Sequence, residues 1–225
     1  MTFSITGFCK KTGMVGVAIT TSSICVASRC PWVRAGVGAA STQNITDPSL
    51  GNLMLDSLEK GLDVQQVIDE ITKNRKFIEY RQLALIDAKG NSSSFTGSKT
   101  LGTNAVSQNK DCIAAGNLLN TIDVVKAMSN FFSENENLHL AERLLLSLQS
   151  GLDAGGEEGP VHSAGLKVAD THSWPLVDLR IDWSEKQPIS ELKNLWYSFK
   201  PQMSQYNLRA INPDQAPSYG VLGDK

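Results

Sequence analysis

Thr2 can supply a catalytic nucleophile once Met1 has been removed. Methionine aminopeptidases remove an initiator Met when the next residue is small, and its removal leaves Thr2 with both a hydroxyl and a free α-amine. A threonine hydroxyl needs a base, and an α-amine with a reference pKa of about 7.7 to 8.0 can accept its proton directly or through water. The alternative interpretation is that Thr2 simply caps the first strand.

Other polar residues have chemistry that fits such a nucleophile. Asn117 follows an expected strand, where its side-chain amide can donate to a developing oxyanion, although Asn beside Gly is also a common turn signal. His162 can carry a proton or bind a substrate carboxylate. Glu157 and Glu158 can receive an amino or guanidino group, but a charged pair beside two glycines is typical of a solvated loop, which we slightly favour.

The remaining titratable residues give no sign of a metal site. His139 and His172 lack a ligand spacing, and Asp178, Arg180 and Asp182 alternate as an ion-pair ladder on one strand face. We therefore expect no metal and no cofactor. The four cysteines lie outside any CxxC spacing and are expected to be small buried residues: Cys9, Cys25, Cys30 and Cys112.

Length and composition indicate one domain. The chain has 225 residues, of which 41% are apolar and 20% charged, which fits a domain over residues 1–200 and a tail over 201–225 that packs on it or on a neighbouring subunit. The net charge of -2 is spread evenly, which excludes nucleic acid and a membrane surface as partners. We expect a cytoplasmic protein that binds a small molecule and forms a homodimer or higher homo-oligomer.

The apolar pattern predicts an unusual start to the fold. Residues 3–9 and 14–20 form a hairpin around the Lys-Lys-Thr-Gly sequence at 10–13. Most chain ends fray unless they are tied down, so a strand that begins this early is informative. Residues 33–40, "VRAGVGAA", predict one further strand that ends in a polar patch at 41–44.

The rest of the chain alternates between helix pairs and strand pairs. Asp63 and Gln66 resemble a capping box at the start of the second helix. The tail from Lys200 shows no clear periodicity. The expected elements are helices over 48–60 and from 63, a hairpin over 80–87 and 92–97, a strand over 112–115, helices over 123–132 and 139–150 with Gly151 ending the second, strands over 161–170 and 176–181, and a helix over 188–199. This order predicts an α+β fold, a four-layer αββα sandwich with two mostly antiparallel sheets between helix pairs.

The layer order and the early strand resemble the N-terminal nucleophile hydrolase superfamily. More specific strings resemble the bacterial domain-of-unknown-function family 1028, which is classed as N-terminal-nucleophile-hydrolase-like and has no general assigned reaction. They extend over residues 2–196 in the family's order: "MTFSI", "PWVRAGVGAASTQ" with "DPSLG", "RQLALIDAKG" with "FTG", "AGNLL", "LAERLL" with "AGG", and "WPLVDLRID".

The resemblance implies roles for further residues. A basic residue early in the strand after the nucleophile keeps the amine unprotonated, and Arg29 and Arg34 compete for this role. Either arginine also fits an ordinary ion pair. Thr42 lies where related enzymes supply a backbone N–H to the oxyanion, although its segment also fits a polar loop with a helix cap. The substrate-contacting candidates are Arg34, Ser22, Gln43, Asn44, Glu157, Glu158 and His162, with Ser41 beside them.

The chain departs from the family pattern in two places. Ser22 stands where members often have a lysine, so any amine chemistry of that lysine is missing or moved here. After "AGG", members commonly carry an acidic residue, two arginines and a glutamine, whereas this chain has Glu157, Glu158, Gly159, Pro160, Val161 and His162. If the segment lines a pocket, the substrate differs in charge from that of other members.

These observations lead to two functional expectations. The first is an amide hydrolase: Thr2 attacks a small linear or cyclic amide, an acyl-enzyme forms, and water activated by the same amine releases the acid, in nitrogen-compound or amino-acid catabolism. The alternative keeps Met1 in place and gives a metabolite-binding protein, or an enzyme of hydration or deamination that uses His162, Glu157, Glu158 and Asn117. A structural module leaves the polar clusters unexplained and ranks last.

Overall fold

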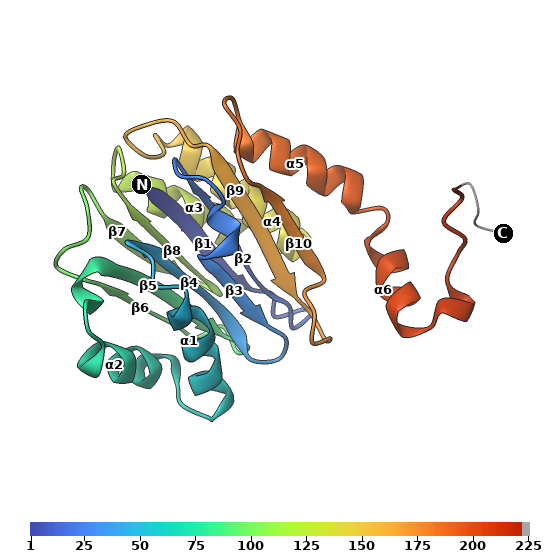
Figure 1. The fold of residues 1–225 in the computed structure, drawn as a ribbon, viewed down its shortest axis with the longest axis horizontal. Helices are drawn as coiled ribbons and strands as arrows, with labels where there is room; N and C mark the ends of the chain where they lie inside the picture. Colours follow the sequence, from blue (N-terminus) through green and yellow to red (C-terminus); the bar gives the residue numbers. More distant parts are fainter. Residues whose placement is uncertain (222–225) are drawn as a thin grey trace.

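Two antiparallel sheets lie face to face, and the N-terminus is held inside the larger one (Figure 1). The computed structural model describes residues 1–221. The larger sheet has the strand order β10-β9-β2-β1-β8-β7. Its strands are β1 (Thr2–Phe8), β2 (Val15–Thr21), β7 (Ala105–Asn109), β8 (Cys112–Asn117), β9 (Ser163–Ala169) and β10 (Val177–Ile181).

The smaller sheet stacks on the central strands of the larger one. It has the order β3-β4-β5-β6, and its middle strands contact β1, β2 and β8. Its strands are β3 (Pro31–Arg34), β4 (Gly38–Asn44), β5 (Arg81–Asp87) and β6 (Ser92–Thr96). The first residues of the chain, in β1, therefore lie at the interface between the two sheets.

Helices cover both outer faces. Three pack on the six-stranded sheet: α3 (Asp123–Glu134), α4 (Leu140–Asp153) and α5 (Pro188–Phe199). Two pack on the four-stranded sheet: α1 (Ser49–Glu59) and α2 (Val64–Asn74). The expected fold class, two antiparallel sheets between helical layers, is confirmed. The capping box of α2 is confirmed as well, since Asp63 accepts from the Gln66 backbone and the Gln66 side chain accepts from the backbone of Asp63.

Strand β1 is held in place by contacts on both of its faces. Phe3 and Ile5 are fully buried against the helices, whereas Ser4 bonds to residues of the smaller sheet. Every residue of β1 and of its neighbour β2 is buried. A first strand in this central position cannot fray, because its removal would expose the main core.

The structure corrects several expected elements. Residues 33–40 form two strands, not one, because Gly36 has a φ of 69° and turns the chain between β3 and β4. The polar patch at 41–44 lies inside β4, and β7 was not expected because its sequence is largely polar. Helix α4 continues through Gly151 to Asp153.

The C-terminal segment also differs from the expectation of a tail without periodicity. It contains the helix α6 (Met203–Ile211), which has no buried residue and projects away from the sandwich (Figure 1). Short 3-10 turns complete the described elements, at Val26–Ser28, Ile78–Tyr80 and Pro213–Gln215.

Candidate functional site

Thr2 lies at the end of the central strand, between two polar residues on the neighbouring strands. It pairs with Thr21 of β2 on one side and with Asn117 of β8 on the other. Only 6% of Thr2 is exposed while Met1 is present. The fold therefore brings the expected nucleophile and the expected oxyanion donor, Asn117, to the same end of the sheet.

The carbonyl oxygen of Met1 is held by two hydroxyls. The Thr2 hydroxyl donates to it at 2.6 Å, and the Thr21 hydroxyl donates to the same oxygen. The two hydroxyl oxygens lie 3.1 Å apart. This end of the sheet therefore already positions a carbonyl group against a potential nucleophile and a second hydrogen-bond donor.

Arg29 reaches this cluster through side-chain hydroxyls. Its Nη2 donates to Ser23 Oγ at 2.7 Å, and Ser23 Oγ lies 3.3 Å from the Thr21 hydroxyl. Burial raises the pKa of the Cys30 thiol, while a hydrogen bond with Thr46, the Arg29 charge and the N-terminal ammonium oppose the rise. The charges of Arg29 and of the N-terminal ammonium therefore both act on the same thiol.

Asn117 belongs to a buried polar network between the two sheets. Its Nδ2 donates to Gln82 Oε1 at 3.2 Å, and Gln82 Nε2 donates to the Gly116 carbonyl at 3.0 Å. Gln43 donates to Gln82 at 2.8 Å and accepts from Ser4 at 2.7 Å. This network fixes the orientation of each amide, and Asn117 Oδ1 is buried with no hydrogen-bond partner among residues 1–221.

Glu157 is the most unusual titratable group at this end of the molecule. It is 5% exposed, and within the described chain neither carboxylate oxygen makes a hydrogen bond of normal geometry. Burial raises the pKa of Glu157 to about 8, although the N-terminal ammonium and the Ser22 backbone N–H oppose this shift. The expected solvated loop is therefore wrong for Glu157, because its segment packs against the residues that follow β8 through a bridge to Leu119, whereas Glu158 is exposed.

A cavity of about 330 Å³ lies beside Glu157. It extends from the end of α4 to the start of α5, and Gly159 forms part of its wall. A Cβ atom on Gly159 would lie 3.2 Å from Met1 Cε, so the Met1 side chain rests on this wall. His162 holds the same region together, since its backbone N–H donates to the Thr21 carbonyl, its Nδ1 lies 2.8 Å from the Ser184 carbonyl oxygen and its ring stacks on Trp183.

Two expected site residues have structural partners instead. Arg34 pairs with Asp56 at 2.7 Å and with Glu59 at 2.8 Å, at the end of the sheets opposite Thr2. The backbone N–H of Thr42 donates to the Cys30 carbonyl at 3.1 Å, which uses the donor that an oxyanion would need. The expected roles of these two residues are corrected accordingly.

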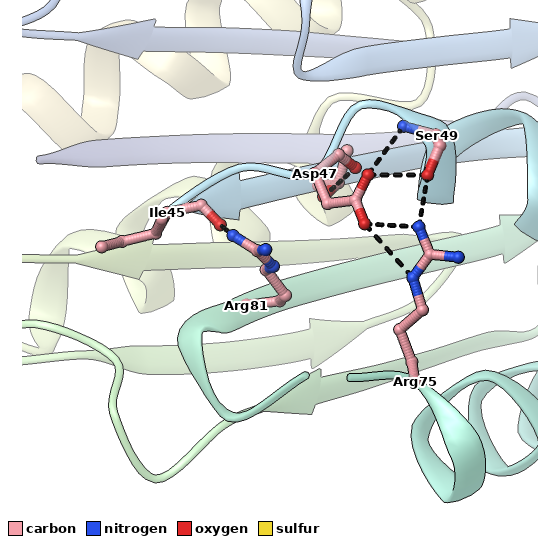
Figure 2. Close-up of polar contacts among 6 residues, drawn as sticks. Ile45, Asp47, Ser49, Arg75 and Arg81 are labelled. Carbon is pink, nitrogen blue, oxygen red and sulfur yellow. Dashed lines mark hydrogen bonds and ion pairs between the residues drawn. The ribbon is translucent and has the colours of Figure 1, made fainter. Parts of the chain in front are cut away.

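Asn44 ends β4 in a left-handed conformation with a φ of 71°. Its amide donates to the Tyr80 carbonyl at 2.6 Å and its oxygen accepts from the Leu101 N–H at 3.2 Å, so both groups hold neighbouring loops rather than face Thr2. The connection that follows is held in place by Asp47, Ser49 and Arg75, and Arg81 donates to the Ile45 carbonyl (Figure 2).

Sequence reasoning missed Thr21, Ser4 and Gln82 as site residues. The available signal was the presence of polar side chains within otherwise apolar strands, which marks positions that face a polar interior.

The ion pairs of β10 differ from the expected ladder of Asp178, Arg180 and Asp182. Arg180 pairs with Asp182, but Asp178 pairs with Lys167 of β9. Three of the four cysteines are buried, and Cys25 is half-buried.

Within residues 1–221, no three His, Cys, Asp or Glu side chains lie close enough together to hold a metal ion. No helix in that range has both the length and the apolar character to cross a bilayer.

Comparison with known proteins gives a family match and a structural match. Residues 2–192 match the family described as "Family of unknown function (DUF1028)". A Silicibacter pomeroyi protein, SPO2555, described as a member of the same family, superposes with a TM-score of 0.82, at 30% identity over 88% of this chain and 89% of that one. Anbu (ancestral beta-subunit) from Yersinia bercovieri gives a TM-score of 0.39 at 11% identity, over 97% of this chain and 100% of that one. No curated protein sequence matches.

Proposed function

The chain belongs to the family of unknown function DUF1028, and from this premise we propose that it is an amide hydrolase with Thr2 as an N-terminal nucleophile. One observation carries the proposal: the Thr2 hydroxyl donates to a carbonyl oxygen at 2.6 Å, at the end of a strand held in the middle of a sheet. Loss of Met1 would free both the hydroxyl and the α-amine at a rigid, partly enclosed position.

The reaction needs few groups. The Thr2 α-amine takes the hydroxyl proton while Oγ1 attacks the amide carbon, and the resulting ammonium returns the proton to the leaving amine. The acyl group then forms an ester on Thr2, and a water activated by the same amine releases the acid. The positive charge of Arg29, linked through Ser23 and Thr21, favours the neutral amine that this mechanism requires.

The developing oxyanion has a candidate donor in Thr21, whose hydroxyl already donates to the Met1 carbonyl oxygen. The side-chain amide of Asn117, which pairs with Thr2 across the sheet, is the second candidate. Because the network through Gln82 fixes Asn117, this donor keeps its orientation during the reaction. The substrate class that fits this mechanism is a small amide, in nitrogen-compound or amino-acid catabolism.

Intact mass and activity together test the proposal. The chain beginning at Thr2, released from a cleavable fusion, should hydrolyse small linear or cyclic amides, whereas the chain that retains Met1 should not. Thr2→Ala should lower turnover by about 1,000-fold or more and leave the thermal midpoint nearly unchanged, while Thr2→Ser should retain part of the activity. Full activity with Met1 in place would contradict the proposal and favour the metabolite-binding alternative.

A further inference from the structure

Met1 occupies the candidate site in the manner of an acyl group. It is joined to Thr2 by an amide bond, and its carbonyl oxygen accepts hydrogen bonds from the hydroxyls of Thr2 and Thr21. An amide substrate that Thr2 attacks must bring its carbonyl carbon to the Thr2 hydroxyl oxygen and its carbonyl oxygen to a donor such as the Thr21 hydroxyl. The other groups of Met1 therefore indicate what surrounds that carbonyl.

The α-ammonium of Met1 and the carboxyl group of Glu157 lie at the same end of the molecule. The Met1 side chain packs against Gly159, which lines the same cavity as Glu157. The charge of the α-ammonium opposes the effect of burial on the pKa of Glu157, and the oxygens of Glu157 have no hydrogen-bond partner of normal geometry in residues 1–221. A buried carboxyl group without a partner is costly in a folded protein, so such a group commonly serves a ligand. A cationic group whose charge acts on Glu157 is the α-ammonium of Met1, two bonds from the carbonyl carbon.

The side chain of Met1 packs against the wall of the neighbouring cavity. Its thioether rests on Gly159, a wall residue of that cavity. The wall includes apolar groups of Leu152, Val161 and Ile189, and the volume of about 330 Å³ lies within the range of small-molecule sites. An uncharged side chain of moderate length fits this space.

We infer that the preferred substrate is an aminoacyl amide with a free α-amine, whose acyl part takes the place of Met1. Glu157 binds its α-ammonium, and the cavity beside Gly159 receives its side chain. The inference rests on the proposed function for the position of the carbonyl, and it names the substrate class that this mechanism leaves open.

Binding tests the inference without catalysis. In the chain that begins at residue 2 and carries Thr2→Ala, L-methioninamide should bind at least about tenfold more tightly than 4-(methylthio)butanamide, which lacks only the α-amine. Glu157→Gln should abolish this difference. Glu134→Gln, which removes an exposed carboxyl at the end of α3, should preserve it. Equal binding of the two amides to the protein with Glu157 intact would overturn the inference.

A second variant tests the cavity. Gly159→Leu places a side chain where the Met1 thioether now lies, so it should weaken L-methioninamide binding about tenfold or more and leave glycinamide binding unchanged. Thermal unfolding of Glu157→Gln and Gly159→Leu checks that both variants fold. Equal loss for both amides in a folded Gly159→Leu protein would overturn the placement of the side chain.

Kinetics separate this inference from the proposed function. The chain beginning at Thr2 should hydrolyse L-methionine p-nitroanilide at least about tenfold more efficiently than its N-acetyl derivative. Equal hydrolysis of both would overturn the inference and support the proposed function. A retained binding preference without hydrolysis of any amide would support the inference about Glu157 and overturn Thr2 as the nucleophile.

Discussion

Two carboxyl groups in loop regions of this molecule have opposite surroundings. Asp47, between β4 and α1, accepts from the Ser49 hydroxyl at 2.6 Å and from Arg75 Nη2 at 2.6 Å (Figure 2). Glu157, between α4 and β9, is more deeply buried and has no such partners in residues 1–221. A carboxylate whose oxygens accept hydrogen bonds stabilises a loop, whereas a carboxylate without such partners is available to a ligand.

The pKa values follow the same contrast. Burial works to raise the pKa of Asp47, but the hydrogen bonds from Ser49 and Arg75, together with the charge of Arg75, outweigh it and lower the pKa. Burial raises the pKa of Glu157 to about 8 because too little opposes it. The two groups therefore affect stability with opposite signs as pH changes.

The largest expected effect is on Glu157. Because its folded pKa is raised, the unfolded chain loses its proton first, and folding is penalised from about pH 4.3 upward until the folded group ionises near pH 8. Glu157→Gln removes this penalty, which has a ceiling of about 5 kcal/mol, and should raise the thermal midpoint by about 4 °C or more at pH 8. At pH 4 the midpoint should hardly change.

Thermal unfolding at the two pH values checks this prediction. Glu134→Gln, which removes an exposed carboxyl, should have no effect at either pH. An equal gain at pH 4 and pH 8 would mean that Glu157 is not held in its neutral form, and the contrast with Asp47 would disappear.

A smaller loss is expected at Asp47. Asp47→Ala removes the acceptor for Ser49 and Arg75 and should lower stability by about 1 to 2 kcal/mol at pH 7, or about 3 to 6 °C. Its lowered folded pKa makes the contribution of Asp47 complete above about pH 4 and lost as pH falls through the folded value.

Denaturation at pH 7 and below pH 3 measures this loss. Asp69→Ala removes an exposed carboxyl of α2 that accepts only from Gln65 at 2.8 Å, and it should lower stability by no more than about 0.5 kcal/mol. If Asp47→Ala lowered turnover and left stability intact, the assignment of Asp47 to a purely structural role would be wrong.

The smallest effect is expected at Arg34. Its ion pairs with Asp56 and Glu59 are partly exposed, and Arg34→Ala should change stability by less than about 1 kcal/mol. The substrate KM and kcat should not change, because the residue lies at the end of the sheets opposite Thr2. A raised KM would restore Arg34 as a substrate contact.

The sequence predicts local structure well where the signal is local. The first hairpin is marked by polar residues between two apolar runs, and the capping box of α2 lies within four residues. Gly36 shows where this fails, since a glycine between small apolar residues fits either a strand or a tight turn. The packing of β3 and β4 between the six-stranded sheet and α1 favours the turn. This packing joins residues that are far apart in the sequence, so the local pattern does not reveal it.

The candidate site is less predictable than the fold. Thr2 and Asn117 could be proposed from their places beside strands, and the structure brings them into register. The glycines near Glu157 favour a solvated loop, yet long-range packing buries this residue. Gln82 and Thr21 were missed because their roles depend on which strands lie side by side.

The central place of β1 also decides how the protein can be handled in the laboratory. A peptide added before Thr2 extends from Met1, whose carbonyl oxygen is held by the hydroxyls of Thr2 and Thr21 at the end of the central strand. An affinity tag at that end would therefore keep the α-amine of Thr2 in an amide bond. A tag after α6 follows a helix that projects from the sandwich, and it leaves the N-terminal residues unchanged (Figure 1).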